Sequence, residues 1–207
     1  MSTPVITDWR QLLKFRCTGC GNCCKGTIVM LTDSDVRRIV EGTGMAPREF
    51  VRFFGENELT MSKRHPFWIR FANRQATMAL RWGRERCIFL DREDRCTIYE
   101  HRPLACREHP FTITVSQRGA VEGLALSNVS ECLYELDGNV TRPELAEVSR
   151  WNEEESAEYQ ERVRIWNSDK KRSRTRTAFM EFLGLEWDYG FRRRKYSRAR
   201  TDLPSFG

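Results

Sequence analysis

The sequence predicts an α+β fold of short helices and hairpins, followed by a helical C-terminal arm. Three observations support this prediction. The apolar patterns before residue 140 are short and of mixed period, whereas a long helical period begins near residue 143. The chain has 207 residues, a length at which one hydrophobic core is usual. No internal repeat or clear linker divides it, so we expect residues 1–140 to form the main domain and 141–207 an extension of it.

The first part of the chain predicts a short strand and two helices. Thr27–Leu31 has the apolar composition of a short strand. Thr32 is a suitable N-cap for a helix over Asp33–Glu41, which carries apolar residues at helical spacing. Pro47 is favoured at the first position of a helix, so a second short helix is expected there. It would present three aromatic side chains, those of Phe50, Phe53 and Phe54.

The middle of the chain predicts a hairpin, a short helix and a further strand. Phe67–Phe71 and Ala76–Trp82 are rich in strand-forming residues and are separated by a short polar turn, which predicts an antiparallel pair. Pro103 can begin a short helix that carries Cys106. Phe111–Val115 has strand composition. This part therefore supplies the β component of the fold.

The C-terminal arm is predicted to be helical and basic. A long helix is expected from Pro143 to about Ser168, and a shorter one over Thr177–Leu183. Residues 170–200 contain eleven Lys and Arg against three acidic residues, a net charge of +8 that leaves −2 for the rest of the +6 chain. Such a tail is a candidate site for an acidic partner or RNA, and a solvated chain end is the alternative.

The composition is that of a globular protein, with 40% hydrophobic residues and no apolar run long enough to span a membrane. The first fifteen residues lack the basic start and apolar stretch of a secretory signal, so a cytoplasmic location and no membrane association are expected. Cysteine clusters in the reducing cytosol usually serve metal binding or catalysis. A disulfide framework is the alternative for an even number of cysteines.

Eight cysteines are the candidate metal ligands. Cys17, Cys20 and Cys23 form two overlapping steps of two intervening residues, so three sulfurs converge from one loop. This run matches the beginning of the bacterial ferredoxin pattern, which favours an iron–sulfur cluster, expected to be of the four-iron type, over zinc. The more distant cysteines would supply further ligands. The full set is Cys17, Cys20, Cys23, Cys24, Cys87, Cys96, Cys106 and Cys132.

The neighbouring pair Cys23 and Cys24 raises the question of how many centres there are. Side chains of adjacent residues on an extended chain point to opposite sides, so the two sulfurs would not easily bind one ion. The eight cysteines are therefore compatible with two four-sulfur sites that share this loop, or with one site and additional free thiols. His109 is a further candidate ligand, while Arg102 and Arg107 are candidates to neutralise thiolate charge or to form surface ion pairs.

Three strings resemble the YkgJ-like cysteine-cluster family. They are Cys17-x-x-Cys20-Gly-x-Cys23-Cys24-x-Gly26, Cys87-Ile-Phe-Leu90, and Cys96-Thr-Ile-Tyr-Glu-x-Arg-Pro-x-x-Cys106-Arg-x-x-Pro-Phe111. Members carry the CxxCxxCC signature and are described as zinc- or iron-chelating proteins, which implies that the eight cysteines act together as ligands. One branch contains flagellin lysine N-methylases, which are associated with an iron–sulfur cluster but are considerably longer. The resemblance covers about residues 15–135.

Three functions follow as hypotheses. The first is a metal-binding protein whose centre has a structural, redox or iron-sensing role. The second is an enzyme, with a lysine methyltransferase-like reaction implied by the family branch, although no substrate or cofactor pocket is evident in the sequence. The third is a module that binds nucleic acid through its basic tail. The sequence has no phosphate-binding loop, dinucleotide-binding fingerprint, HExxH or GxSxG motif, which excludes the commonest enzyme classes that carry them.

Overall fold

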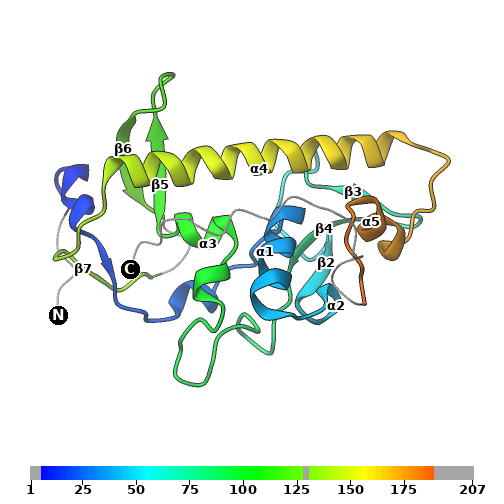
Figure 1. Cartoon of the computed structure of the whole chain (residues 1–207), viewed down its shortest axis with the longest axis horizontal. Coiled ribbons are helices and arrows are strands. Elements are labelled where there is room, and N and C mark those ends of the chain that lie inside the picture. The colour runs from blue at the N-terminus through cyan, green and yellow to red at the C-terminus, as the bar shows by residue number, and fades with distance from the viewer. Residues whose placement is uncertain (1–5, 128–130, 189–207) are drawn as a thin grey trace.

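The computed structural model describes residues 6–127 and 131–188, and within them the chain forms short helices, three small sheets and one long helix (Figure 1). The elements occur in the order η1 (Trp9–Lys14), β1 (Arg16–Cys17), η2 (Asn22–Cys24), α1 (Asp33–Thr43), α2 (Pro47–Phe50), β2 (Val51–Gly55), β3 (Ile69–Arg70), β4 (Gln75–Leu80), η3 (Tyr99–His101), α3 (Leu104–Glu108), β5 (Phe111–Val115), β6 (Val121–Leu126), β7 (Tyr134–Glu135), α4 (Arg142–Ser168) and α5 (Arg176–Phe182).

The sheets are small and antiparallel. One has the order β2-β4-β3, with Phe53 opposite Met78. The second is the β5–β6 hairpin, and the third pairs β1 with β7. Helices account for 37% and strands for 19% of the described residues, and because the sheets are antiparallel the strands need no helical crossovers. The predicted α+β class is confirmed.

Helix α1 begins where its sequence predicts. The hydroxyl of Thr32 accepts a hydrogen bond from the Asp35 backbone N–H, and the Asp35 carboxylate accepts one from the Thr32 N–H, which forms a capping box. The helix ends at Thr43, two residues later than predicted, because Gly44 takes a left-handed conformation as its C-cap. Its apolar stripe, Val36, Ile39 and Val40, is buried in the core.

Helix α4 runs along the length of the molecule (Figure 1). Leu145 and Val148 in its first half belong to a smaller core cluster, whereas Tyr159, Val163 and Trp166 in its second half belong to a larger one. Helix α4 therefore contributes to both clusters. No helix among the described residues has the length and apolar character that a membrane crossing requires.

The two core clusters are built from different parts of the chain. The larger contains residues of α1, the β2-β4-β3 sheet, the second half of α4, and α5, whose Phe179 and Met180 are fully buried. The smaller contains residues of η1, β5, β6 and the first half of α4. Both α4 and α5 therefore pack against elements from residues 1–140, and α4 also forms part of the wall of the site described below.

Several strand predictions are wrong in detail. Thr27–Leu31 forms no strand and contributes only an isolated bridge from Met30 to Ala79. Phe53 and Phe54 lie in β2 and not in the preceding helix, which stops at Phe50. The hairpin of β3 and β4 is confirmed but shorter than predicted. Strands this short are decided by pairing with distant segments, which local sequence does not encode.

Candidate metal centre

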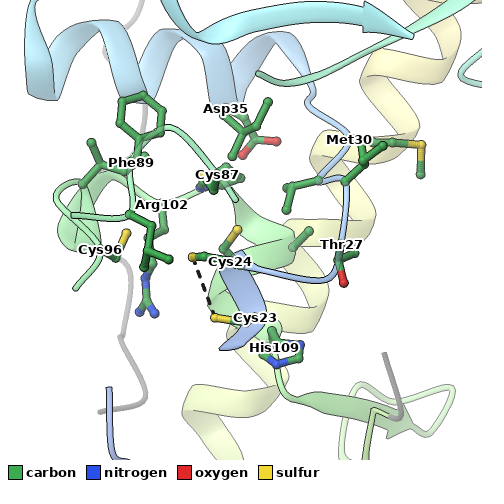
Figure 2. Close-up of a pocket in the computed structure, with 18 of the residues that line it drawn as sticks. Cys23, Cys24, Thr27, Met30, Asp35, Cys87, Phe89, Cys96, Arg102 and His109 are labelled. Carbon is green, nitrogen blue, oxygen red and sulfur yellow. Dashed lines mark hydrogen bonds between the residues drawn. The ribbon is translucent and has the colours of Figure 1, made fainter. Parts of the chain in front are cut away.

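All eight cysteines line one cavity of about 750 Å³. The cysteines come from the segment of residues 17–24, from the segment of residues 87–106, and from Cys132. Figure 2 shows Cys96 and Arg102 on one side of this cavity, Cys23 and Cys24 near its middle, and Thr27 and Met30 on the other side. All eight are free thiols, so the alternative of a disulfide framework is not supported.

The segment of residues 17–24, here named the hook, is shaped by glycine. Gly19 and Gly21 have φ angles of +68° and +69°, a region that other residues adopt at a cost. A Cβ atom on Gly21 would lie 2.6 Å from the backbone oxygen of Asp94. The hook therefore packs directly against the turn of residues 91–95, and only glycine allows so close an approach.

The first part of the hook is attached to the chain around Cys132. Cys17 pairs with Tyr134 in the β1–β7 sheet. The Thr18 hydroxyl donates a hydrogen bond to the backbone oxygen of Leu133 at 2.8 Å. The side-chain amide of Asn22 donates to the backbone oxygen of Glu131 at 2.8 Å. Three contacts thus hold Cys132 beside the start of the hook.

The end of the hook is attached to the segment of residues 87–96. The backbone N–H of Cys87 donates to the backbone oxygen of Cys24 at 2.8 Å. Leu90 and Cys96 face each other in an isolated antiparallel bridge, and the Thr97 N–H donates to the Phe89 oxygen at 2.8 Å. These bonds fold residues 87–97 back on themselves, which brings Cys96 to the same side as Cys87 and Cys24.

Cys106 is presented by α3, which Pro103 precedes as its N-cap. The helix begins as the sequence predicts. Buried Arg107 donates hydrogen bonds to the backbone oxygens of Arg102 and Glu100 and does not line the cavity. Through these hydrogen bonds its guanidinium braces the turn before α3.

Cys23 and Cys24 lie closer together than predicted. Both belong to the 3-10 turn η2, and their Sγ atoms are 4.0 Å apart. Two sulfurs on one tetrahedral zinc are roughly 3.8 Å apart, given a Zn–S bond of about 2.3 Å. The expectation that the two side chains point to opposite sides of an extended strand is therefore wrong, because the backbone turns here.

Cys23, Cys24 and Cys132 hold their protons strongly in the absence of a metal ion. The contact with Cys24, together with burial, raises the pKa of Cys23 far above its ordinary value. The contact with Cys23 lowers the pKa of Cys24, but its contact with Cys87 and its burial outweigh this and raise that pKa to about 12. Burial, with Cys17 and Cys20 nearby, raises the pKa of Cys132 to about 12. A metal ion must therefore displace protons to bind.

Burial also raises the pKa of Cys96 and Cys106, while the guanidinium of Arg102 opposes the shift at both. This guanidinium lies over the Tyr99 ring, 3.5 Å from the ring centroid, and donates to the Tyr99 backbone oxygen. Its Nη2 atom is buried and has no hydrogen-bond partner among the described residues. A partly buried cation near Cys23, Cys96 and Cys106 suits an anionic thiolate centre, because burying its charge alone would be costly.

The donor set therefore fits a thiophilic metal: eight free thiols on one cavity, with a partly unsatisfied guanidinium among them. The sulfurs line the same cavity but do not have the geometry of a metal site. Among residues 6–127 and 131–188, no three His, Cys, Asp or Glu side chains already have the arrangement of a metal site. Thiol side chains turn about a single χ1 angle, so rotamer changes are the simplest way to bring these sulfurs together around a metal.

The cavity also has a wall that the sequence pattern did not predict. Asn152, Ser156 and Gln160 lie one turn apart along α4 and line it. Their spacing of four residues places them on one helix face, which can be recognised in the sequence. A polar face on a long helix usually contacts solvent, however, so it does not by itself indicate a cavity wall. His65 and His109 also line the cavity, and burial lowers the pKa of both. His109 lines the same cavity as Cys23 and remains a candidate ligand (Figure 2).

Comparison with known proteins places the chain in a family. Neither the curated proteins nor the solved structures contain a match to it. A family model does match residues 16–133, which is more than half of the 207 residues and includes all eight cysteines. The chain therefore belongs to the CxxCxxCC family, described as "Putative zinc- or iron-chelating domain".

Proposed function

We propose that this chain is a metal-binding protein whose ligands are the thiolates of Cys17, Cys20, Cys23, Cys24, Cys87, Cys96, Cys106 and Cys132. The observation that carries the proposal is that all eight, spread over more than a hundred residues of sequence, line one cavity. Membership of a zinc- or iron-chelating family supports it.

Of the two metals, we propose iron, bound as iron–sulfur clusters. Three sulfurs arrive from one glycine-rich loop in overlapping steps, as in the ferredoxin pattern, whereas structural zinc sites more often use separate pairs. The cavity of about 750 Å³ is also far larger than a single ion needs, and inorganic sulfide would occupy part of it. A cluster at this place would join the hook to residues 87–106 and take up and release an electron.

The experiment is metal and acid-labile sulfide analysis of protein purified without oxygen. Iron and sulfide in equal amounts, with visible absorption that dithionite bleaches, are the expected result. Stoichiometric zinc without colour would reject the cluster and keep the metal function. A metal-free protein with an unchanged fold would reject both.

A second candidate is an enzyme, and one observation favours it. The cavity falls in the range of small-molecule sites, about 300–1,000 Å³, and part of its wall is made of Asn152, Ser156 and Gln160 instead of sulfur. A methyltransferase-like reaction on lysine is the specific form that the family branch suggests. Calorimetry with S-adenosylmethionine on the metal-loaded protein tests this form, and no heat of binding would set it aside.

The nucleic-acid hypothesis loses part of its support. Arg172 pairs with Asp169 at 3.1 Å, and Arg174 donates to the backbone oxygens of Trp166 and Asp169, both at 2.7 Å. These side chains fasten the turn between α4 and α5, although Arg172 is also exposed to solvent. The basic residues of the 192–200 segment lie outside the described residues, so binding of RNA or an acidic partner there stays a hypothesis.

A further inference from the structure

The contacts of the cysteines divide them into two groups. Cys87 is part of the larger core cluster, and Cys24 and Cys96 pack against it. Cys17 and Cys132 pack against the smaller cluster instead. Because the two clusters are built from different elements, each group of cysteines is held by a different part of the fold.

The hydrogen bonds around the hook give the same division. The start of the hook is bound to residues 131–134 through Thr18, Asn22 and the pairing of Cys17 with Tyr134. The end of the hook is bound to Cys87 through the backbone oxygen of Cys24. The first set of bonds does not involve the segment of residues 87–106, and the second does not involve residues 131–134.

The remaining cysteines join these groups by proximity. Cys106 lies on α3 at the end of the segment of residues 87–106 and lines the cavity together with Cys87 and Cys96 of that segment. Cys20 lies in the hook between Thr18 and Asn22, whose side chains are bonded to Leu133 and Glu131 on either side of Cys132. Cys23 lies between the groups, 4.0 Å from Cys24 across the η2 turn. Asn22, the residue before Cys23, donates to the oxygen of Glu131, the residue before Cys132. The group of Cys24 already has four sulfurs, so we assign Cys23 to the other group.

We infer that the chain builds two separate four-thiolate centres, one from Cys24, Cys87, Cys96 and Cys106 and one from Cys17, Cys20, Cys23 and Cys132. This inference rests on the proposed metal function and adds how many centres there are and which ligands each has. The first centre is anchored in the larger core beside Arg102, and the second spans the junction of the hook with residues 131–134. The adjacent residues Cys23 and Cys24 place the two centres side by side.

The two centres differ in exposure, which makes them separable by experiment. Cys87 is buried, whereas Cys23 is exposed. A chelator should therefore remove metal from the second centre first. Each centre releases four thiols when it is emptied, so the order of release shows which cysteines share a centre.

The test uses metal-loaded wild-type protein under anaerobic conditions. It is treated with a chelator over time, and samples are alkylated and mapped by mass spectrometry. The expected result is two phases: Cys17, Cys20, Cys23 and Cys132 become alkylated together, and the other four follow with the remaining metal. A single phase for all eight, or sets with other members, would overturn the division. A wild-type protein that takes up no metal would instead refute the proposed function, which separates the two failures.

Two variants provide a second measurement. In Asn22→Ala the bond to the Glu131 oxygen is lost without removal of a ligand, so the first phase should become faster and the second should keep its rate. In the double variant C17S/C132S the protein should retain about half of the wild-type metal and the α-helical circular dichroism. Loss of all metal from a C17S/C132S protein that keeps its fold would show that the eight thiols form one centre.

Discussion

The carboxylate of Asp35 accepts a hydrogen bond from the backbone N–H of Leu104 at 2.9 Å. This bond joins α1 to the first residue of the helix that carries Cys106. The same side chain pairs with Arg38 at 2.7 Å, and Arg38 is fully buried and pairs also with Glu155 of α4. The position of one candidate ligand thus depends on a buried ionic network that connects three helices.

Replacement of Asp35 by alanine should strongly destabilise the protein. It removes the Leu104 contact and leaves Arg38 buried with one partner fewer, and loss of one member of a buried ion pair costs about 3–5 kcal/mol. The measurement is the free energy of unfolding in urea. Glu161→Gln is the control, because it breaks an exposed pair with Arg164 on α4 and should change that energy by less than about 1 kcal/mol. Equal effects would contradict the role given to this network.

The Gly21→Ala variant should lose metal binding. Its Cβ would lie 2.6 Å from the Asp94 oxygen at a φ of +69°, so the hook must move away from the turn it packs against. Gly119→Ala is the matched control, since its φ is +77° but nothing lies within 4 Å of the added Cβ. Both variants should lose about 1 kcal/mol or more of stability to the backbone conformation. Only Gly21→Ala should reduce the metal content, and equal metal in both would refute the docking of the hook.

Metal affinity should rise with pH. The pKa values of Cys24 and Cys132 are raised to about 12, so both thiols carry protons at neutral pH and a metal ion must displace them. Protons compete less as the pH rises, and the apparent affinity should increase about tenfold per pH unit for each proton released. Competition with a chromogenic zinc chelator between pH 7 and 8.5 measures this slope. An affinity that does not change over this range would show that the thiols are already deprotonated.

The Arg102→Gln variant should bind metal less tightly. It removes the cation that faces Cys96 and Cys106 and opposes the rise of their pKa, so their thiolates become less stable. Metal release to a chelator should become about tenfold faster, which corresponds to about 1.4 kcal/mol. Arg164→Gln, at an exposed ion pair of α4, is the control and should release metal at the wild-type rate. Equal rates of metal release from the two variants would show that Arg102 does not stabilise the bound metal.

Much of the helical structure was predictable, and so was the set of candidate ligands. The capping box of Thr32 and Asp35 and the N-cap of Thr141 lie within a few residues of the helices that they begin. Their interactions are local, so a short stretch of sequence contains them. The spacing of Cys17, Cys20 and Cys23 is local in the same sense, and the residues of the hook alone are enough to indicate a metal-binding loop.

The cavity wall on α4 and the strand partners of the hook were not predictable. Asn152, Ser156 and Gln160 have the spacing of any polar helix face, and only packing turns that face towards the cysteines. Strand β7, two residues long, exists because it pairs with β1. A two-residue strand has no sequence pattern of its own.

The sequence by itself determined the chemistry of this protein: eight thiols, a glycine-rich turn that can curl, and helices with their own start signals. Only the tertiary structure decided which thiols are neighbours. Cys17 and Cys132 meet through strand pairing, and Cys24 and Cys87 through one backbone hydrogen bond. Such contacts join residues far apart in the chain, and they form only when the two hydrophobic cores bring their segments together.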